Sequence, residues 1–191
     1  MASNPPDFAK IAMRAALRRR RRRLALACPD AATRAAEALP LDRLAPFAVV
    51  AGYRPIGGEM DPEPVLARLL AAGAVLALPA AVDRRGPLEF RAVRPRDTPI
   101  MDIAGVPAPP PGAPRLAPGI VIAPLLAFDR EGGRLGQGGG HYDRTIAALR
   151  AAGPVLIVGL AFAGQEVARV PREAHDERLD AILTETGYIE V

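Results

Sequence analysis

Uninterrupted apolar runs alternate along this chain with segments whose apolar residues recur at helical spacing. The longest runs carry no charged residue and predict buried strands at residues 47–53, 74–78, 120–128 and 154–160. Shorter stretches predict further strands at residues 88–93 and 179–184. Helices are predicted at residues 7–28, 30–39, 61–72 and 142–152. The alternation indicates an α/β fold: a three-layer domain with a mainly parallel sheet covered by helices, preceded by an N-terminal helical pair.

Proline and aspartate residues mark where several of these elements begin and end. Pro29 stops the first helix, and Asp30 is suited to cap the second because its side chain accepts hydrogen bonds from free backbone N–H groups. Asp61 and Pro62 predict the start of the third helix in the same way. Residues 94–118 are dense in proline, which removes backbone donors, so we predict an extended surface loop without regular structure.

Length and composition fit one cytoplasmic domain. The chain has 191 residues, 50% of them hydrophobic, so we expect residues 1–191 to form a single domain around one core. Cys28 is the one cysteine, which excludes an internal disulfide and a cysteine metal cluster and fits a reducing compartment. No apolar stretch approaches about 18 residues, so we expect neither a secretory signal nor a membrane span.

The charge of the chain suits an anionic partner without identifying it. The formal net charge is +4, and Lys10 is the one lysine among 25 basic residues. An unbroken arginine run, residues 18–23, occupies every face of the first predicted helix. We therefore expect most of these arginines to extend into solvent and assign them no catalytic role. The run could instead contact nucleic-acid phosphates, although aromatic residues for stacking make up only 4% of the chain.

A glycine-rich loop, residues 129–140, connects a predicted strand to a predicted helix. Its clustered glycines permit positive φ angles and let backbone N–H groups approach phosphate oxygens at the helix N-terminus. They are Gly136, Gly138, Gly139 and Gly140. The loop lacks the Lys-Ser/Thr ending of a P-loop, so a tightly turning connection without a ligand is the alternative. Arg134 could hold a phosphate, and Asp143 is a hard oxygen ligand suited to Mg²⁺.

Further candidate binding groups lie elsewhere in the chain. Lys10 and Arg14 are four residues apart on one helix face and could grip a polyphosphate, or they could form a solvated basic face. Glu59 follows a buried strand, where a carboxylate could accept hydrogen bonds from a pterin ring or serve as a cap. Asp176 could be a second metal ligand, whereas the neighbouring His175 is more often structural or exposed.

Taken in this order, the residues resemble the 5-formyltetrahydrofolate cyclo-ligase family over nearly the whole chain. The most specific match is Arg134-Leu-Gly-Gln-Gly-Gly-Gly-His-Tyr-Asp-Arg144, similar to the family's R-x-G-x-G-x-G-Y-Y-D loop. The supporting matches are Lys10-x-x-x-Arg14, Tyr53-x-Pro-x-Gly-Gly-Glu59 and Pro171-x-Glu173-x-His175-Asp176. His141 stands where the family has its first Tyr, which fits a role for a flat ring rather than for a phenol hydroxyl.

The resemblance implies an ATP-dependent enzyme with a Mg²⁺ ion. It implies catalytic roles for Lys10, Arg134 and His141. The implied ATP-binding residues are Lys10, Ile11, Ala12, Met13, Arg14, Arg134, Leu135, Gly136, Gln137, Gly138, Gly139, Gly140, His141 and Tyr142. The implied folate-binding residues are Arg54, Glu59, Gln137, Gly138, Gly139, Gly140 and His141, and the implied metal ligands are Asp143 and Asp176.

The implied reaction is cyclisation of 5-formyltetrahydrofolate to 5,10-methenyltetrahydrofolate with release of ADP and phosphate. A formyl group on nitrogen is an amide, so the implied route activates it by phosphoryl transfer from ATP and forms an iminium phosphate. We expect a cytoplasmic monomer that binds folate, with or without a polyglutamate tail, and neither nucleic acid nor membrane. The alternatives are a nucleic-acid-binding module that uses residues 18–23 and another small-molecule phosphotransferase on the same scaffold.

Overall fold

The computed structural model describes residues 8–44, 47–94 and 96–191, with side chains from residue 11 onward. Within these residues a central sheet contains parallel strands and an antiparallel strand at each edge. The parallel strands are β1 (Val49–Ala51), β2 (Val75–Ala80), β6 (Ile120–Pro124), β9 (Leu156–Leu160) and β10 (Ala181–Thr184). The edge strands are β3 (Glu89–Ala92) and β11 (Gly187–Glu190). The strand order is β11-β10-β9-β6-β1-β2-β3, which confirms the predicted mainly parallel sheet.

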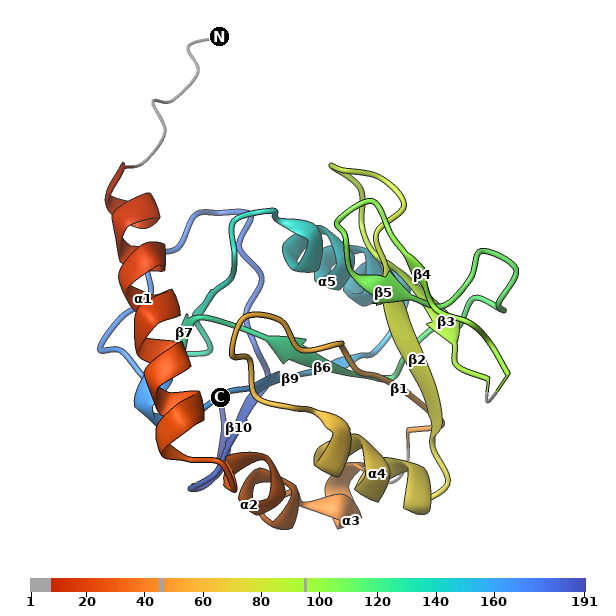
Figure 1. The fold of residues 1–191 in the computed structure, drawn as a ribbon, viewed down its shortest axis with the longest axis horizontal. Coiled ribbons are helices and arrows are strands. Elements are labelled where there is room, and N and C mark those ends of the chain that lie inside the picture. Colours follow the sequence, from red (N-terminus) through yellow and green to blue (C-terminus); the bar gives the residue numbers. More distant parts are fainter. Residues whose placement is uncertain (1–7, 45–46, 95) are drawn as a thin grey trace, which may run out of the picture.

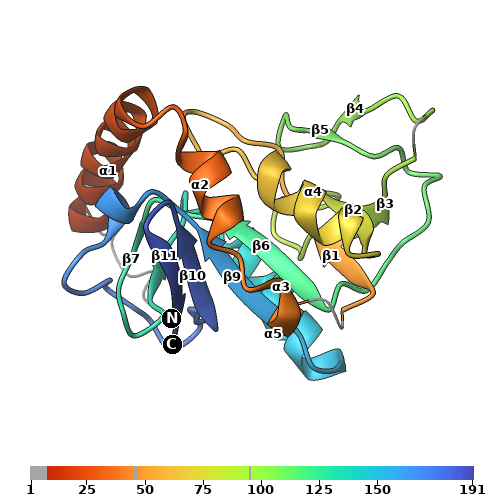
Figure 2. The same ribbon diagram turned by 90° about the horizontal axis from the view of Figure 1, so that it is seen from below.

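Helices cover both faces of this sheet (Figures 1 and 2). The helices on one face are α2 (Ala31–Glu37), α3 (Leu41–Leu44) and α4 (Glu63–Ala71), and the opposite face carries α5 (His141–Ala152). The long N-terminal helix α1 (Phe8–Ala27) lies beside the sheet against the short 3-10 helix η1 (Ala163–Gln165). The predicted three-layer α/β fold with its N-terminal helical pair is confirmed. No helix in the described ranges combines the length and the apolarity that a bilayer crossing needs.

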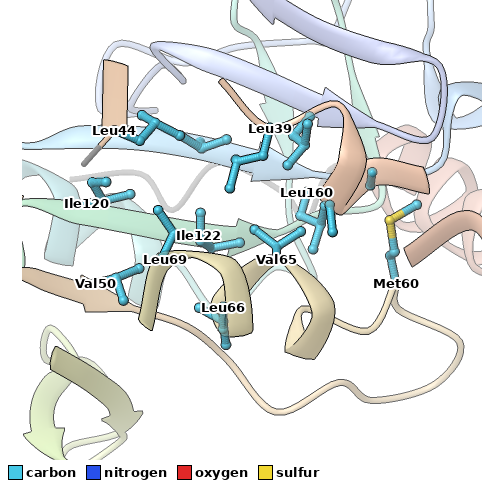
Figure 3. Packing of buried hydrophobic residues seen from close by; sticks show 14 of the residues in the cluster. Leu39, Leu44, Val50, Met60, Val65, Leu66, Leu69, Ile120, Ile122 and Leu160 are labelled. Atoms are coloured by element: carbon cyan, nitrogen blue, oxygen red, sulfur yellow. The ribbon is translucent and has the colours of Figure 1, made fainter. Parts of the chain in front are cut away.

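The largest core cluster fills the space between the sheet and the helices α2 to α4. Val65 and Leu69 project from α4 toward Val50 and Ile122 of the central strands (Figure 3). Each of these side chains is almost fully buried, and burying one of this size contributes about 1.5–3 kcal/mol. Ile146 of α5 is buried in a second cluster on the other face. The core therefore fixes the strand ends from which the candidate site is built.

The predicted strand over residues 120–128 is interrupted at Leu125 and Leu126 and forms two strands instead of one. After β6 ends at Pro124, the carbonyl groups of Leu125 and Leu126 accept hydrogen bonds from the side chain of Gln165 instead of from a neighbouring strand. The chain then forms β7 (Ala127–Phe128), which pairs with β8 (Arg134–Leu135) inside the predicted loop. This hairpin supports the glycine-rich segment that follows it.

The prediction that residues 94–118 lack regular structure is also wrong. They contain a small hairpin of β4 (Ile100–Met101) and β5 (Pro107–Ala108). The carboxylate of Asp102 accepts hydrogen bonds from the backbone N–H groups of Ala104 and Val106, each at 2.9 Å, and so closes the turn. A side chain thereby supplies the local order that the proline content argued against.

Other element boundaries differ from the predictions by a few residues. The strand predicted over residues 47–53 is only three residues long as β1, and the second helix ends at Glu37. Asp30 occupies the N-cap position of α2, but its carboxylate makes no cap hydrogen bond and pairs with Arg34 at 3.5 Å. The sequence patterns did not predict α3, η1 or β11.

Candidate active site

A cavity of about 600 Å³ opens beyond the carboxyl ends of the central parallel strands. Strand β2 pairs with one side of β1, whereas β6 pairs with the other side and β9 follows β6 outward. The strand order therefore reverses between β1 and β6. Ligands of open α/β sheets bind at such a crevice. Tyr53 after β1 and Leu125 after β6 both line the cavity. Its volume lies in the usual range of small-molecule sites.

The glycine-rich loop forms one wall of this cavity. Gly138 and Gly140 have φ angles of 103° and 66°, which favour glycine, and Gly140 is the N-cap of α5. Within the described residues, no hydrogen bond engages the backbone N–H groups of Gly138, Gly139 and Gly140. These free donors lie at a helix N-terminus, where the helix dipole also favours an anion. The loop geometry therefore fits the phosphate groups of a nucleotide.

Helix α1 holds the glycine-rich loop in place. Arg14 lines the cavity and donates from Nε to the carbonyl oxygen of Gly136 at 3.2 Å. Arg18 donates from Nε to Oε1 of Gln137 at 2.8 Å. Ile11 also lines the cavity, whereas Ala12 and Met13 point elsewhere, since Met13 packs with a separate apolar cluster. The side chain of Lys10 lies outside the described residues.

Arg134 and Asp143 form an ion pair at the inner end of the loop. Nη2 of Arg134 lies 2.5 Å from Oδ1 of Asp143, and the Arg134 side chain is only 3% exposed. The same Asp143 oxygen accepts a hydrogen bond from the N–H of Glu177 at 3.3 Å. Nε of Arg134 is buried without a partner among the described residues. The pair places one positive and one negative group in the cavity wall, and each keeps unused hydrogen-bonding capacity.

Buried Tyr53 and half-buried Tyr142 both have hydroxyl groups whose pKa is raised. Desolvation, followed by the negative charge of Glu59, raises the pKa of Tyr142 above its ordinary value, although nearby Arg134 opposes this. Burial and Glu59 likewise raise the pKa of Tyr53 well above its ordinary value. The hydroxyl of Tyr53 donates to the carbonyl oxygen of Met60 at 2.5 Å. Both residues therefore present protonated hydroxyl groups and flat rings at neutral pH.

Glu59 lines the same cavity as the glycine-rich loop, and its carboxylate is held by two partners. Oε1 pairs with Nη1 of Arg21 at 3.0 Å, and Oε2 accepts a hydrogen bond from the N–H of Ile56 at 3.0 Å. Arg54, which also lines the cavity, is exposed. The predicted folate ligands Arg54 and Glu59 thus lie at one cavity wall.

The expectation that most arginines of the run extend into solvent is confirmed, but Arg18 is half-buried against Gln137 and Arg21 is fully buried. Arg19, Arg20, Arg22 and Arg23 are exposed. Arg21 is only 2% exposed, because it lies on the same face of α1 as Leu17 and Leu24, which pack inward. The helical period therefore selects one arginine of the run for burial.

His141 is oriented by a backbone group. Its Nδ1 lies 3.0 Å from the carbonyl oxygen of Gly86, so Nδ1 must carry the donated proton. Thr145, one turn later in α5, donates to the carbonyl oxygen of His141 and accepts from the N–H of Leu88. The loop around Gly86 therefore fixes the imidazole ring at the cavity wall, where His141 is one of the lining residues.

The carboxylates suggested for Mg²⁺ line the same cavity. Asp143 pairs with Arg134 as described, and Oδ2 of Asp176 accepts a hydrogen bond from the N–H of Glu173 at 2.7 Å. In the described ranges, no three His, Cys, Asp or Glu side chains cluster closely enough to hold a metal ion by themselves. Mg²⁺ is commonly bound by one or two carboxylates together with substrate phosphates. Asp143 and Asp176 fit that mode of binding.

Sequence reasoning missed part of the cavity. Asp102, Ala104 and Val106 from the β4–β5 hairpin also line it. No local pattern predicts this contribution, because the hairpin reaches the cavity through contacts with distant parts of the sheet. The burial of Arg21 could have been found from its spacing relative to Leu17 and Leu24.

Comparisons with known proteins agree with these observations. Residues 7–185 match the model of the 5-formyltetrahydrofolate cyclo-ligase family. The chain is 33% identical over 142 residues to a 5-formyltetrahydrofolate cyclo-ligase of Mycolicibacterium smegmatis, which covers 71% of this chain and 72% of the relative. It is also 33% identical over 140 residues to the Escherichia coli protein of the same name, covering 71% and 76% of the two chains.

A solved structure is similar over almost the full length. The structure of Aquifex aeolicus 5,10-methenyltetrahydrofolate synthetase superimposes with a TM-score of 0.73 at 27% identity. The match covers 95% of this chain and 92% of that one. The two proteins therefore share the same fold over almost their full length.

Proposed function

Because the chain belongs to the 5-formyltetrahydrofolate cyclo-ligase family, and is therefore a ligase, we propose that it converts 5-formyltetrahydrofolate to 5,10-methenyltetrahydrofolate with ATP and Mg²⁺. The observation that carries the proposal is one cavity with two different walls. One is formed by the glycine-rich loop at the N-terminus of α5, and the other contains the carboxylate of Glu59 from the loop after β1. The first wall suits a nucleotide, and the second suits a pterin.

The two walls bind the two substrates by different chemistry. Free N–H groups of Gly138, Gly139 and Gly140, with Arg14 behind them, would meet the phosphate oxygens of ATP. The carboxylate of Glu59 would accept hydrogen bonds from the N–H and amino groups of the pterin, whose ring can pack between apolar side chains. The reacting formyl group would then lie between the walls.

The proposed route begins with transfer of the γ-phosphoryl group to the formyl oxygen. ADP leaves, and the formyl carbon becomes an iminium phosphate. The second folate nitrogen then bonds to this carbon and releases its proton to solvent, and phosphate leaves with the original formyl oxygen. The charges in the cavity wall would stabilise this sequence, because phosphoryl transfer depends mainly on positioning and charge neutralisation.

The chain's own residues would supply most of this stabilisation. Arg134 would use its remaining N–H groups toward phosphate oxygens, and Lys10 is proposed for the same role from α1. Nδ1 of His141 is hydrogen-bonded to the carbonyl oxygen of Gly86, which fixes the imidazole ring. The flat face of this ring would then pack on a ligand. Mg²⁺, held by Asp143 and Asp176 together with the phosphates, would neutralise charge on the transferred group.

A second cavity supports the proposal that the folate carries a polyglutamate tail. It has a volume of about 590 Å³ and adjoins the first, since both share Pro171, Glu173 and Asp176. Its lining also includes Arg169, Arg172 and Arg178, whose guanidinium groups would attract the carboxylates of such a tail.

The proposed activity can be tested directly. The purified protein is incubated with 5-formyltetrahydrofolate, ATP and Mg²⁺, and formation of the methenyl product is followed by its near-ultraviolet absorbance while released phosphate is measured. We expect one phosphate for each product molecule and no product without ATP or after Mg²⁺ is chelated. Phosphate release that does not depend on folate would instead indicate a different phosphotransferase.

A further inference from the structure

Arg21 is one of the largest fully buried side chains in the described part of the chain, although it belongs to a run of six arginines. Its guanidinium group is bound at several points. Nη1 donates to the carbonyl oxygen of Leu125 at 3.1 Å and pairs with Glu59 at 3.0 Å. Nη2 donates to the carbonyl oxygens of Ile56 and Gly57 at 3.2 and 3.3 Å.

These partners lie on both sides of the point where the strand order reverses. Ile56, Gly57 and Glu59 belong to the loop after β1, and Leu125 follows β6. Arg21 therefore ties the loop that carries Glu59 to the end of the neighbouring strand. Arg21 is absent from the cavity lining, whereas Glu59 and Leu125 belong to it. The guanidinium group thus acts from behind the cavity wall.

Burying the Arg21–Glu59 ion pair costs more free energy than burying apolar side chains of the same volume. Both side chains are nearly inaccessible, at 2% for Arg21 and 4% for Glu59, so both charges have lost most of their hydration. Nε of Arg21 is in addition buried without a partner in the described residues. An apolar residue would fill the same volume without these penalties, as Leu17 and Leu24 do on the same helix face. The arrangement is therefore explained better by what the carboxylate has to do than by stability.

The carboxylate geometry shows what the ion pair achieves. Arg21 engages Oε1 of Glu59, and the N–H of Ile56 engages Oε2. Each carboxylate oxygen can accept more than one hydrogen bond, so both retain capacity toward the cavity. With one oxygen bound to Arg21 and the other to the N–H of Ile56, the orientation of the carboxylate is fixed.

We propose that Arg21 is a positioning residue for folate recognition: it fixes the orientation of the Glu59 carboxylate from the side away from the substrate. The proposal rests on the proposed function, because Glu59 is assigned there to the pterin. Arg21 touches neither substrate, so its loss should affect folate binding through Glu59 and leave the nucleotide wall unchanged.

The main test compares Arg21→Met with Arg20→Met. Arg20 is an exposed residue of the same run, so both variants lose one charge from α1. For Arg21→Met we expect the dissociation constant for 5-formyltetrahydrofolate, measured without ATP, to rise at least tenfold. The dissociation constant for a non-hydrolysable ATP analogue should stay within about twofold, and Arg21→Lys should recover part of the folate affinity. Arg20→Met should change neither constant.

A double-mutant cycle with Glu59→Gln separates positioning from a general structural role. If Arg21 acts through Glu59, adding Arg21→Met to Glu59→Gln should change folate affinity by less than about twofold. The double variant also contains no unpaired buried charge, so it remains informative if Arg21→Met alone does not fold.

The outcomes distinguish the two proposals. A folded Arg21→Met that binds folate normally, beside a clear defect in Glu59→Gln, would overturn the role of Arg21 and leave the proposed function intact. Additive losses in the double variant would also overturn it. Normal folate affinity in Glu59→Gln would instead remove Glu59 from the folate site, and the failure would then belong to the proposed function.

Discussion

Charged residues of the cavity wall bind one another. Asp143 uses Oδ1 for Arg134 and for the N–H of Glu177, so a metal ion would have to bind Oδ2 or displace these contacts. The ion pair keeps a carboxylate in place at the N-terminus of α5, and it also holds Arg134 beside the glycine-rich loop. In the proposed function, Asp143 would serve the cation and Arg134 the anion.

We expect Asp143→Asn to lower turnover about ten- to a hundredfold at limiting Mg²⁺, with partial recovery at high Mg²⁺. The amide keeps the shape and one acceptor oxygen but loses the charge that holds the metal. Asp180→Asn is the matched control, because Asp180 pairs with Arg150 at 2.8 Å and does not line the cavity. Steady-state rates across a Mg²⁺ series would decide, and equal behaviour of the two variants would contradict a metal role for Asp143.

His141 allows a separate test at the same scale. We expect His141→Tyr to keep most of the activity and His141→Ala to lose about 1 kcal/mol of binding, roughly fivefold, because a flat ring is lost. Wild type and the Tyr variant should show the same dependence of rate on pH. A much lower rate in the Tyr variant together with a changed pH profile would show that the imidazole transfers a proton.

Some secondary-structure elements could be predicted from the sequence and others could not. The parallel strands and α5 were predictable because their apolar runs and helical spacing are local properties of the chain. The break after Pro124 was not, because it depends on Gln165, whose side chain binds the carbonyl oxygens of Leu125 and Leu126 from 40 and 39 residues away. The burial of Arg21 follows from its spacing relative to Leu17 and Leu24, but its partner Glu59 could not be identified locally, since Glu59 lies 38 residues further along the chain. Contacts with residues far along the chain therefore determine the structural features that local sequence patterns do not predict.

The same limit applies to the candidate site. The glycine-rich loop, Arg14, Glu59 and Asp143 could be located from sequence, and the structure brings them to one cavity. Which of them bind each other could not be deduced, because ion pairs such as Arg134–Asp143 depend on side-chain packing.

The positive φ of Gly138 gives a prediction at the level of the loop. A Cβ atom there would lie 3.4 Å from Cζ of Arg14, whereas Gly73, with a similar φ of 97°, has nothing within 4 Å. We expect both Gly→Ala variants to lose about 1–2 kcal/mol of stability through backbone strain. Only Gly138→Ala should raise the KM for ATP. Thermal melts and ATP titrations would show this, and unchanged ATP kinetics would argue against the phosphate cradle.

For the molecule as a whole, the unusual titrating groups are tyrosines rather than lysines. Lys10 is the one lysine, so few other side chains change charge between pH 9 and about 11. Tyr53 and Tyr142 have raised pKa values because burial disfavours the phenolate, and burial raises the pKa of Tyr188 as well. Global stability at alkaline pH should therefore depend on these rings.

We expect the free energy of unfolding to fall as pH rises above about 10. Below that value the tyrosines are protonated in both the folded and the unfolded state, so they do not make the free energy of unfolding depend on pH. Above it the unfolded chain releases protons that the folded chain retains, which favours unfolding by up to about 1.4 kcal/mol per pH unit for each such group. Denaturant titrations at several pH values would measure the slope, and Tyr53→Phe should make it shallower. Ionisation of all three tyrosines near pH 10 in the native protein would contradict the expectation.

Helix α1 is held by residues that are synthesised long after the helix itself. Arg18 binds Gln137, which lies 119 residues further along the chain, and Leu24 packs where Gly164 leaves room for it. At about 5–20 residues per second of synthesis, the helix waits on the order of ten seconds for these partners. Throughout that wait we expect the exposed arginines of α1 to keep the nascent segment hydrated and to repel neighbouring nascent chains of the same kind. The charge on the outer surface of α1 should thus also help to protect the unfinished polypeptide from aggregation.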